Sequence, residues 1–332
     1  MDASLEVLWL SKPDRTFESD WLRELFVMSS LDVEIKFVDD SHEPEDKPTV
    51  LICGFRQQYG NILKKLTSRG TKYGVVLLSD EHIVEPMGFL NDPNCLFCIR
   101  NYYKESVAAH PKVGFFGLGY KNGFRETKSS GQNNGLVWSF AGAMRPGPRG
   151  GMSKAFAGIT PHREVQTASF DDPKGLRLEE YKQMLSDSTF ALCPMGSVNA
   201  DSFRLYESLE AGCIPVVTKT DRFIRPPKNH WELLFFHKNV PFVTGDTWED
   251  CAAKVRGLLA GSPAEIARKR QQCQLFYSLL KHEWAGQFRR AFSLLLEVAH
   301  IEEATDHGMA HPAVTFIGKP EKEKLTIWVK PW

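Results

Sequence analysis

The segment that most constrains the fold of this chain is residues 190–217, which read FALCPMGSVNADSFRLYESLEAGCIPVV. A short apolar run, 190–193, leads into a polar loop that contains glycine. Residues 202–211 are then rich in helix formers and stop at Gly212, a residue typical of helix ends. A second apolar run, 214–217, follows directly. This order predicts a βαβ unit, two parallel strands joined by a helix.

The start of the predicted helix is suited to binding an anion. A helix N-terminus presents unpaired backbone N–H groups and the positive end of the helix dipole, so we expect the amides around Ser202 to bind phosphate oxygens. Arg204 and Glu207 share one helix face, where the guanidinium can meet a diphosphate while the carboxylate accepts from ribose hydroxyls. The alternative is an ordinary surface ion pair on a packing helix. The predicted nucleotide-binding residues of this unit are Pro194, Gly196, Ser197, Ser202, Arg204 and Glu207.

The same segment resembles the signature of the exostosin-type glycosyltransferases. That pattern is a strand, Cys-Pro, a Gly/Ser loop, Ser-x-Arg-x-x-Glu and Gly-Cys-Ile-Pro-Val, here Cys193-Pro194, Gly196, Ser202 to Glu207 and 212–216. Similarity is weaker around it and weakest over the first third of the chain. The resemblance implies two doubly wound Rossmann-like domains facing a cleft, the GT-B architecture. It also implies inverting transfer of a sugar, in the xylose or uronic acid class, from a nucleotide-sugar donor such as a UDP-sugar to a glycan or glycoconjugate hydroxyl.

Length and strand pattern also indicate two domains. At 332 residues the chain is long for one compact core, and short apolar runs alternate with helix-compatible segments in two separate stretches. We expect an acceptor-binding Rossmann-like domain over 1–130 and a nucleotide-sugar-binding Rossmann-like domain over 131–310. Residues 127–135, rich in Ser, Gly, Asn and Gln, are the predicted linker. The tail, 311–332, has two strand-like runs and fits a hairpin.

The alternation predicts the following elements. The strands expected in the first domain are 7–10, 33–38, 49–53, 73–78, 96–99 and 113–116. In the second domain they are 136–140, 155–159 (a strand or the edge between a strand and a helix), 190–193, 214–217 and 241–243. The expected helices are 21–28, 61–68, 179–186, 202–211, 247–259 and 263–280.

Composition excludes several classes of function. The chain has 41 basic and 41 acidic residues, so nothing in its charge supports a nucleic-acid or membrane-surface partner. Seven cysteines form no disulfide framework, and the Cys95/Cys98 pair lacks the second pair of a zinc site, so we expect free, mostly buried thiols. The first residues show neither a leader peptide nor a membrane span. We therefore expect a cytoplasmic microbial or viral enzyme, or a Golgi-lumenal one if the chain is an excised catalytic domain.

The leaving diphosphate needs a counter-charge in the transition state. The sequence contains no Asp-x-Asp motif, so we expect catalysis without a metal, with the nucleotide-sugar as co-substrate and no other cofactor. Arg204, assisted by the helix dipole, is the first candidate for this role. Arg145 and Arg149, in the Gly/Pro-rich loop after the strand at 136–140, are secondary candidates. The alternative for that loop is a solvated basic surface.

A base must also deprotonate the acceptor hydroxyl. The strand at 73–78 runs into Ser79-Asp80-Glu81-His82, and ligands of open α/β sheets lie beyond the carboxyl ends of strands. Asp80 is the predicted base, with Glu81 or His82 as substitutes, although helix capping explains the same residues. His82 also joins the predicted acceptor-binding residues, which follow this strand and the next two: His82, Arg100, Tyr103 and Tyr120.

Two other functions stay open at this point. A dinucleotide oxidoreductase would use the same nucleotide-binding unit, but no Gly-x-Gly-x-x-Gly follows the first predicted strand. A catalytically inactive carbohydrate-binding or scaffold protein would use the eight tryptophans to stack on sugars, although most of these should lie in the core.

Overall fold

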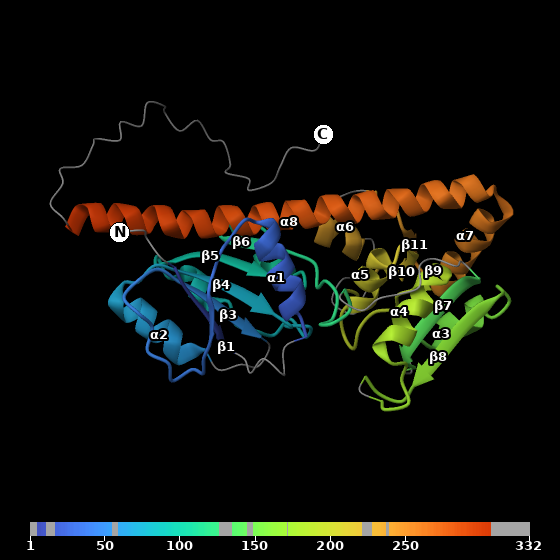
Figure 1. Cartoon of the computed structure of the whole chain (residues 1–332), viewed down its shortest axis with the longest axis horizontal. Coiled ribbons are helices and arrows are strands. Elements are labelled where there is room, and N and C mark those ends of the chain that lie inside the picture. Colours follow the sequence, from blue (N-terminus) through green and yellow to red (C-terminus); the bar gives the residue numbers. More distant parts are fainter. Residues whose placement is uncertain are drawn as a thin grey trace, which may run out of the picture. The chain divides into compact units, whose positions relative to one another are not determined.

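The computed structural model describes residues 5–10, 17–54, 59–125, 135–144, 149–170, 172–220, 228–236 and 239–306. The chain divides into two compact units, which we describe separately (Figure 1). The first unit comprises 1–14, 29–115 and 286–332, and the second comprises 15–28 and 116–285. Both units are discontinuous in sequence, because the helix at 19–28 groups with the second unit and the end of the last helix groups with the first.

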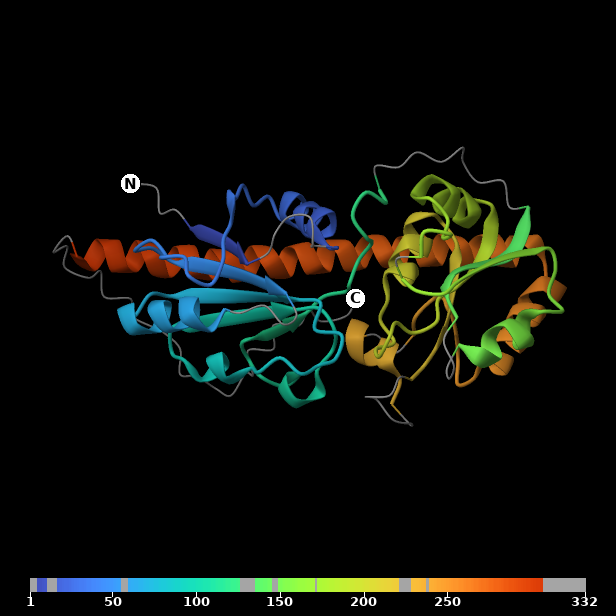
Figure 2. The same ribbon diagram turned by 90° about the horizontal axis from the view of Figure 1, so that it is seen from below.

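The first unit contains a parallel sheet with the strand order β2-β1-β3-β4-β5-β6. Its strands are β1 (Glu6–Leu10), β2 (Ile35–Phe37), β3 (Thr49–Gly54), β4 (Tyr73–Leu78), β5 (Cys95–Arg100) and β6 (Val113–Phe115). The central strands are buried on both faces, as their continuous apolar runs require. Helix α2 (Gly60–Arg69) and the end of α8 (Pro263–Asp306) cover opposite faces (Figures 1 and 2). Phe97 of β5 stacks on Phe292 of α8 at 6.0 Å between centroids.

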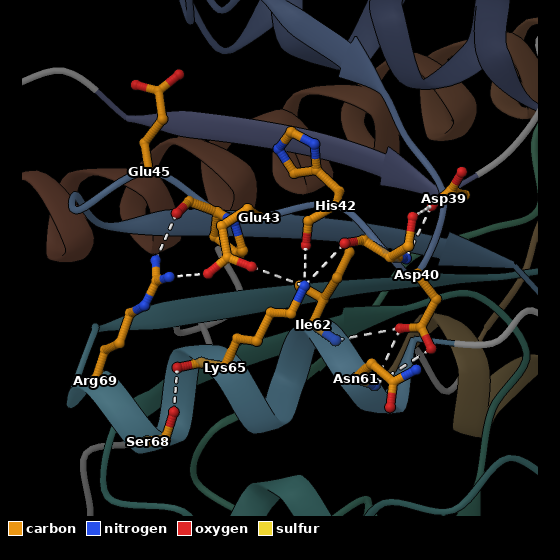
Figure 3. Close-up of polar contacts among 12 residues, drawn as sticks. Asp39, Asp40, His42, Glu43, Glu45, Asn61, Ile62, Lys65, Ser68 and Arg69 are labelled. Carbon is orange, nitrogen blue, oxygen red and sulfur yellow. Dashed lines mark hydrogen bonds and ion pairs between the residues drawn. The ribbon is translucent and has the colours of Figure 1, made fainter.

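Polar contacts attach the connection between β2 and β3 to α2 (Figure 3). The Asp40 carboxylate accepts hydrogen bonds from the backbone N–H groups of Asn61 and Ile62 at 3.0 and 3.2 Å. It therefore caps a helix whose own N-cap residue supplies no side-chain bond. One turn later, Lys65 donates to the carbonyls of Ser41 and His42, both at 2.8 Å.

The second unit contains a parallel sheet with the strand order β11-β10-β9-β7-β8. Its strands are β7 (Leu136–Ala143), β8 (His162–Thr167), β9 (Ser188–Leu192), β10 (Ile214–Thr218) and β11 (Val243–Gly245). Its helices are α1 (Ser19–Met28), α3 (Gly150–Phe156), α4 (Leu178–Ser186), α5 (Phe203–Glu210), α6 (His230–Phe235), α7 (Trp248–Ala260) and the first part of α8. Trp21 fixes α1 in this unit, because it is fully buried, donates to the Gly117 carbonyl at 3.0 Å and meets Trp284 edge-on.

Strand order locates the point in each sheet where the chain reverses direction. In the second unit the chain runs from β7 to β8 on one side and returns to β9 on the other, so the reversal lies between β7 and β9. In the first unit the corresponding point lies between β1 and β3. Ligands of doubly wound sheets bind beyond the carboxyl ends of the strands at this point. In the second unit that edge comprises the ends of β7 and β9.

The predicted α/β class with two doubly wound parallel sheets is confirmed. The predicted βαβ unit is β9, α5 and β10, in which the two strands pair in parallel and are largely buried. The segment 155–159 forms no strand: it is the end of α3 and a following turn. Strand β8 was missed because HREVQT is polar, as an edge strand can be. The last helix runs to Asp306, well past the predicted end at residue 280.

Three further expectations concern the chain as a whole. All seven cysteines are free and buried, as predicted. Among the helices of the described residues, none combines the length and apolar character needed to span a bilayer. The predicted linker at 127–135 lies outside the described residues except for its last residue, and the expected domain boundary near 130 lies outside them too. The predicted tail at 311–332 lies entirely outside them.

Candidate functional site

Arg149 joins the two strand ends at the reversal point of the second sheet. Its guanidinium donates to the carbonyl of Ala143 at the end of β7, at 2.6 Å. It also donates to the carbonyls of Met195 and Gly196, in the loop after β9, at 2.6 and 3.1 Å. Arg149 is only 6% exposed. The sequence predicts that Arg149 contacts the nucleotide, whereas the structure uses its donors to hold the two sides of the site together.

Arg204 lies at the same edge, in the first turn of α5. Its Nε donates to the Ala141 carbonyl of β7 at 2.9 Å, and its guanidinium carbon lies 5.4 Å from the centroid of Phe140. A Cβ placed on Gly142, whose φ is 150°, would come within 2.1 Å of the Arg204 Nη2. Within the described part of the chain, no hydrogen-bond acceptor is recorded for Nη1 or Nη2. The side chain is therefore fixed by its stem and Nε, and its two terminal nitrogens can bind an anion.

Glu207, one turn further along α5, is buried at 5% exposure. Its carboxylate accepts from the hydroxyl of Tyr181 in α4 at 2.9 Å and from the backbone N–H of Lys121 at 3.3 Å. Burial raises the pKa of Glu207, and the hydrogen bond from Tyr181 opposes this rise. A buried carboxylate with these partners is not the surface ion pair that the sequence left open. The side chain could exchange its long bond to Lys121 for a ligand hydroxyl.

The loop between β9 and α5 turns back on itself. The backbone N–H of Gly196 donates to the Asn199 carbonyl at 2.7 Å, and Ser197, at the tip, is exposed. Ser202 is the N-cap residue of α5, with extended backbone, but its hydroxyl contacts the buried Pro194 carbonyl at 3.5 Å and does not cap the helix. The amides at the start of α5 are thus not bonded by the Ser202 side chain.

Of the other residues predicted to bind the nucleotide, Arg145 lies outside the described residues.

In the first unit, Asp80 and Arg100 form an ion pair at the carboxyl ends of β4 and β5. The Arg100 Nη2 lies 2.9 Å from Asp80 Oδ2, and both side chains are completely buried. The Asp80 carboxylate also accepts from the backbone N–H groups of Val84 and Glu85, at 3.0 and 3.2 Å. No α-helix follows Asp80, so these bonds fix a loop and do not cap a helix. Because the Asp80 side chain is completely buried and paired with Arg100, the geometry makes it a positioning residue.

The remaining predicted acceptor-binding residues differ in exposure. Glu81 and His82 are half-buried in the loop after β4. Tyr103 is 6% exposed and lies against Phe115, with the centroids 5.1 Å apart. Tyr120 belongs to the second unit, is 2% exposed and donates its hydroxyl to Glu24 at 2.5 Å. Burial therefore makes Arg100, Tyr103 and Tyr120 parts of the cores of their units, and leaves Glu81 and His82 as the accessible side chains.

Sequence reasoning missed three residues of this site. Gly142 makes room for Arg204, Tyr181 donates to Glu207, and Lys121 contributes its backbone N–H. Gly142 is the one residue of the three that the local sequence could have indicated. It follows the predicted strand at 136–140, and a glycine in a strand often marks the close approach of another group. Tyr181 and Lys121 lie 26 and 86 residues from Glu207, and no local pattern connects them.

Comparisons with known proteins agree with the signature. The family model of the RXYLT1 C-terminal domain matches residues 164–294. Exostosin-1 of Drosophila melanogaster is 33% identical over 119 residues, which are 35% of this chain and 14% of that protein. The chain thus corresponds to a small part of that relative's length. The family-model match at 164–294 includes β9, α5 and β10, and together the two matches confirm the exostosin-like resemblance.

One solved structure supports the two-sheet fold, and a second is similar at a lower TM-score. The N-terminal domain of Candida albicans trehalose-6-phosphate phosphatase superposes with a TM-score of 0.50 over 90% of this chain and 97% of that domain, at 9% identity. A mutant O-GlcNAc transferase of Thermobaculum terrenum superposes with a TM-score of 0.45 over 91% of this chain and 69% of that one, at 10% identity. Like the predicted fold, the chain contains two parallel α/β sheets, one in each unit. Over residues 164–294 the chain therefore resembles the exostosin-like glycosyltransferases.

Proposed function

We propose that this chain transfers a sugar from a nucleotide-sugar donor to a hydroxyl of a glycan or glycoconjugate. The donor we propose is a UDP-sugar of the xylose or uronic acid class, and the reaction inverts the anomeric carbon. The observation that carries the proposal is Arg204, held against β7 through Nε and with its terminal nitrogens able to bind a diphosphate. This guanidinium lies at the reversal point of the sheet, where ligands of doubly wound folds bind.

Each of the proposed site residues in the second unit then has a distinct role. Arg204 neutralises the charge that develops on the departing diphosphate, together with the N-terminal amides of α5. Glu207 accepts from the ribose hydroxyls, while Tyr181 holds its carboxylate in place. Arg149 keeps the loop after β9 attached to the end of β7. A guanidinium and a helix terminus supply this positive charge without a metal ion, so we propose metal-independent transfer.

For the base, the proposal moves from Asp80 to its neighbours. The Asp80 side chain is completely buried, is paired with Arg100 and accepts from two loop amides, so we propose that it positions the loop and does not act as the base. Glu81, or His82 beside it, is half-buried at the same strand end and has the chemistry to take the proton. Glu81→Gln and His82→Gln separate the two: the variant that removes the base should lose turnover and keep the affinity for the nucleotide.

Nucleotide binding and turnover test the proposal directly. Thermal melting of the chain with UDP, GDP and NAD should show stabilisation by a nucleoside diphosphate, after which a panel of nucleotide-sugars identifies the donor. Arg204→Ala should lower turnover roughly 100- to 1,000-fold, the usual effect of removing one transition-state donor. Arg256→Ala, at an exposed position in α7 of the same unit, is the matched control and should be neutral.

Three outcomes would contradict the proposal. Stabilisation by NAD alone would favour an oxidoreductase, and binding of glycans without any nucleotide would favour an inactive carbohydrate-binding or scaffold protein. Turnover that depends strictly on manganese and stops with a chelator would contradict the metal-independent mechanism.

A further inference from the structure

A cluster of aromatic rings lies exposed beside the start of α5. The rings of Phe17 and Phe170 meet edge to face with their centroids 5.6 Å apart, and Phe203 lies 6.4 Å from Phe17. The Lys121 ammonium lies over both Phe17 and Phe170, at 5.1 and 4.5 Å from the centroids. Phe17 is 39% exposed and Phe170 is 50% exposed. We call Phe17, Phe170, Phe203 and Lys121 the aromatic cluster.

Four segments far apart in the sequence build this cluster within the second unit, one of them the start of α5. Phe17 precedes α1, Lys121 lies in the turn before residue 125, and Phe170 follows β8. The Asn122 N–H donates to the Phe17 carbonyl at 2.9 Å, so backbone contacts fix α1 to the Lys121 segment. Large rings held on separate elements and left exposed are costly in water unless something covers them.

The cluster is continuous with the residues proposed to bind the nucleotide. Phe203 is the first residue of α5 and directly precedes Arg204. The backbone N–H of Lys121 donates to Glu207, the residue proposed to accept from the ribose. The side chain of the same lysine covers two of the rings. A ligand whose ribose lies at Glu207 therefore extends its base toward the aromatic cluster, because a nucleobase is attached directly to the ribose.

We propose that the aromatic cluster binds the nucleobase of the donor, with the exposed ring of Phe170 as the stacking surface. This inference rests on the proposed function and adds the base-recognition residues to it. An ammonium has three donors and no acceptor, so Lys121 favours a base that presents carbonyl oxygens, such as uracil, over adenine. Stacking on an aromatic side chain suits a flat base with one face open to the ring.

Binding measurements on matched variants test the proposal. Isothermal titration compares Phe170→Ala and Phe17→Ala with the wild type, with UDP as one probe and inorganic pyrophosphate as the other. Phe170→Ala should weaken UDP roughly 5- to 150-fold in Kd, which corresponds to about 1–3 kcal/mol of stacking. Pyrophosphate, which has no base, should bind equally to all of them. Leu279→Ala removes an apolar side chain of similar exposure, 60%, from α8 and should change neither affinity.

The outcomes separate this proposal from the one on which it rests. If the wild type binds no nucleoside diphosphate, the proposed function and the base site fail together. If UDP binds the wild type and Phe170→Ala with equal affinity, only the base site is overturned. Equal weakening of UDP and pyrophosphate would mean that the variant damages the phosphate site, and would also overturn it. Phe170→Trp gives a second readout: UDP should quench its added fluorescence, relative to the wild type.

Discussion

Arg149→Lys tests whether the buried arginine at the reversal point is structural. The substitution keeps the positive charge but replaces a planar fork with a single ammonium on a flexible stem. Arg149 donates to three carbonyls in two segments, and a lysine can satisfy one or two of them. Losing two charge-assisted hydrogen bonds, at about 1.5 kcal/mol each or more, destabilises the second unit by about 3 kcal/mol or more. For a domain of this size the melting temperature should fall by roughly 6–12 °C.

Differential scanning calorimetry with and without UDP gives the answer. The control is Arg163→Lys, in β8 of the same unit, where the side chain is exposed and the exchange should be neutral. The expected result is a lower melting temperature without UDP, accompanied by weaker UDP binding. If Arg149→Lys melts within about 2 °C of the wild type yet loses UDP affinity, then Arg149 contacts the nucleotide directly, as the sequence predicts, and the reasoning from its carbonyl contacts is wrong.

Three other substitutions have defined outcomes. Asp80→Ala leaves the buried Arg100 without its carboxylate and should cost about 3–5 kcal/mol in urea denaturation, and a loss below 1 kcal/mol would contradict the buried pair. Gly142→Ala should lower the free energy of unfolding by about 1–3 kcal/mol and weaken UDP binding, because the added Cβ displaces the Arg204 guanidinium. The control is Gly158→Ala, which has open space around its Cβ position and should do neither. Glu207→Gln should raise the melting temperature at pH 8, and this gain should disappear toward pH 4. The raised pKa of Glu207 makes the wild type lose stability as pH rises, whereas a glutamine does not titrate. A difference in melting temperature between variant and wild type that stays constant across pH would refute this.

The sequence predicts best those strands that are covered on both faces of the sheet. The runs at 49–53 and 73–78 agree with β3 and β4 to within one residue, because strands covered on both faces carry unbroken apolar sequences. Strand β8 lies at a sheet edge and has one apolar residue, Val165, so its sequence does not distinguish it from a loop. The extension of α8 past residue 280 could not be predicted from helix propensity alone, since it depends on tertiary packing such as that of Phe292 on Phe97 of β5.

The site was predictable where its geometry is local. Arg204 and Glu207 could be named as candidates from the sequence because they share one face of a helix that directly follows the loop. The roles of Asp80 and Tyr120 depend on partners 20 and 96 residues away, Arg100 and Glu24. Sequence places charged and aromatic residues at strand ends, where ligands bind, but the packing of neighbouring strands decides which of them turn inward.

This distinction explains what the exostosin-like signature encodes. Cys193 is buried, and its thiol contacts the Ser208 hydroxyl and the Arg204 carbonyl in α5 at 3.5 and 3.4 Å. Cys213 is buried as well, and its thiol contacts the Leu185 carbonyl of α4 at 2.9 Å. Gly212 ends α5 with a φ of 79°, a conformation that favours glycine. Most of the signature therefore holds α5 between two strands and α4, so substitutions there should lower stability and activity together. Arg204 is partly exposed and bonds β7 through Nε alone, so a change there should lower turnover while the unit stays folded.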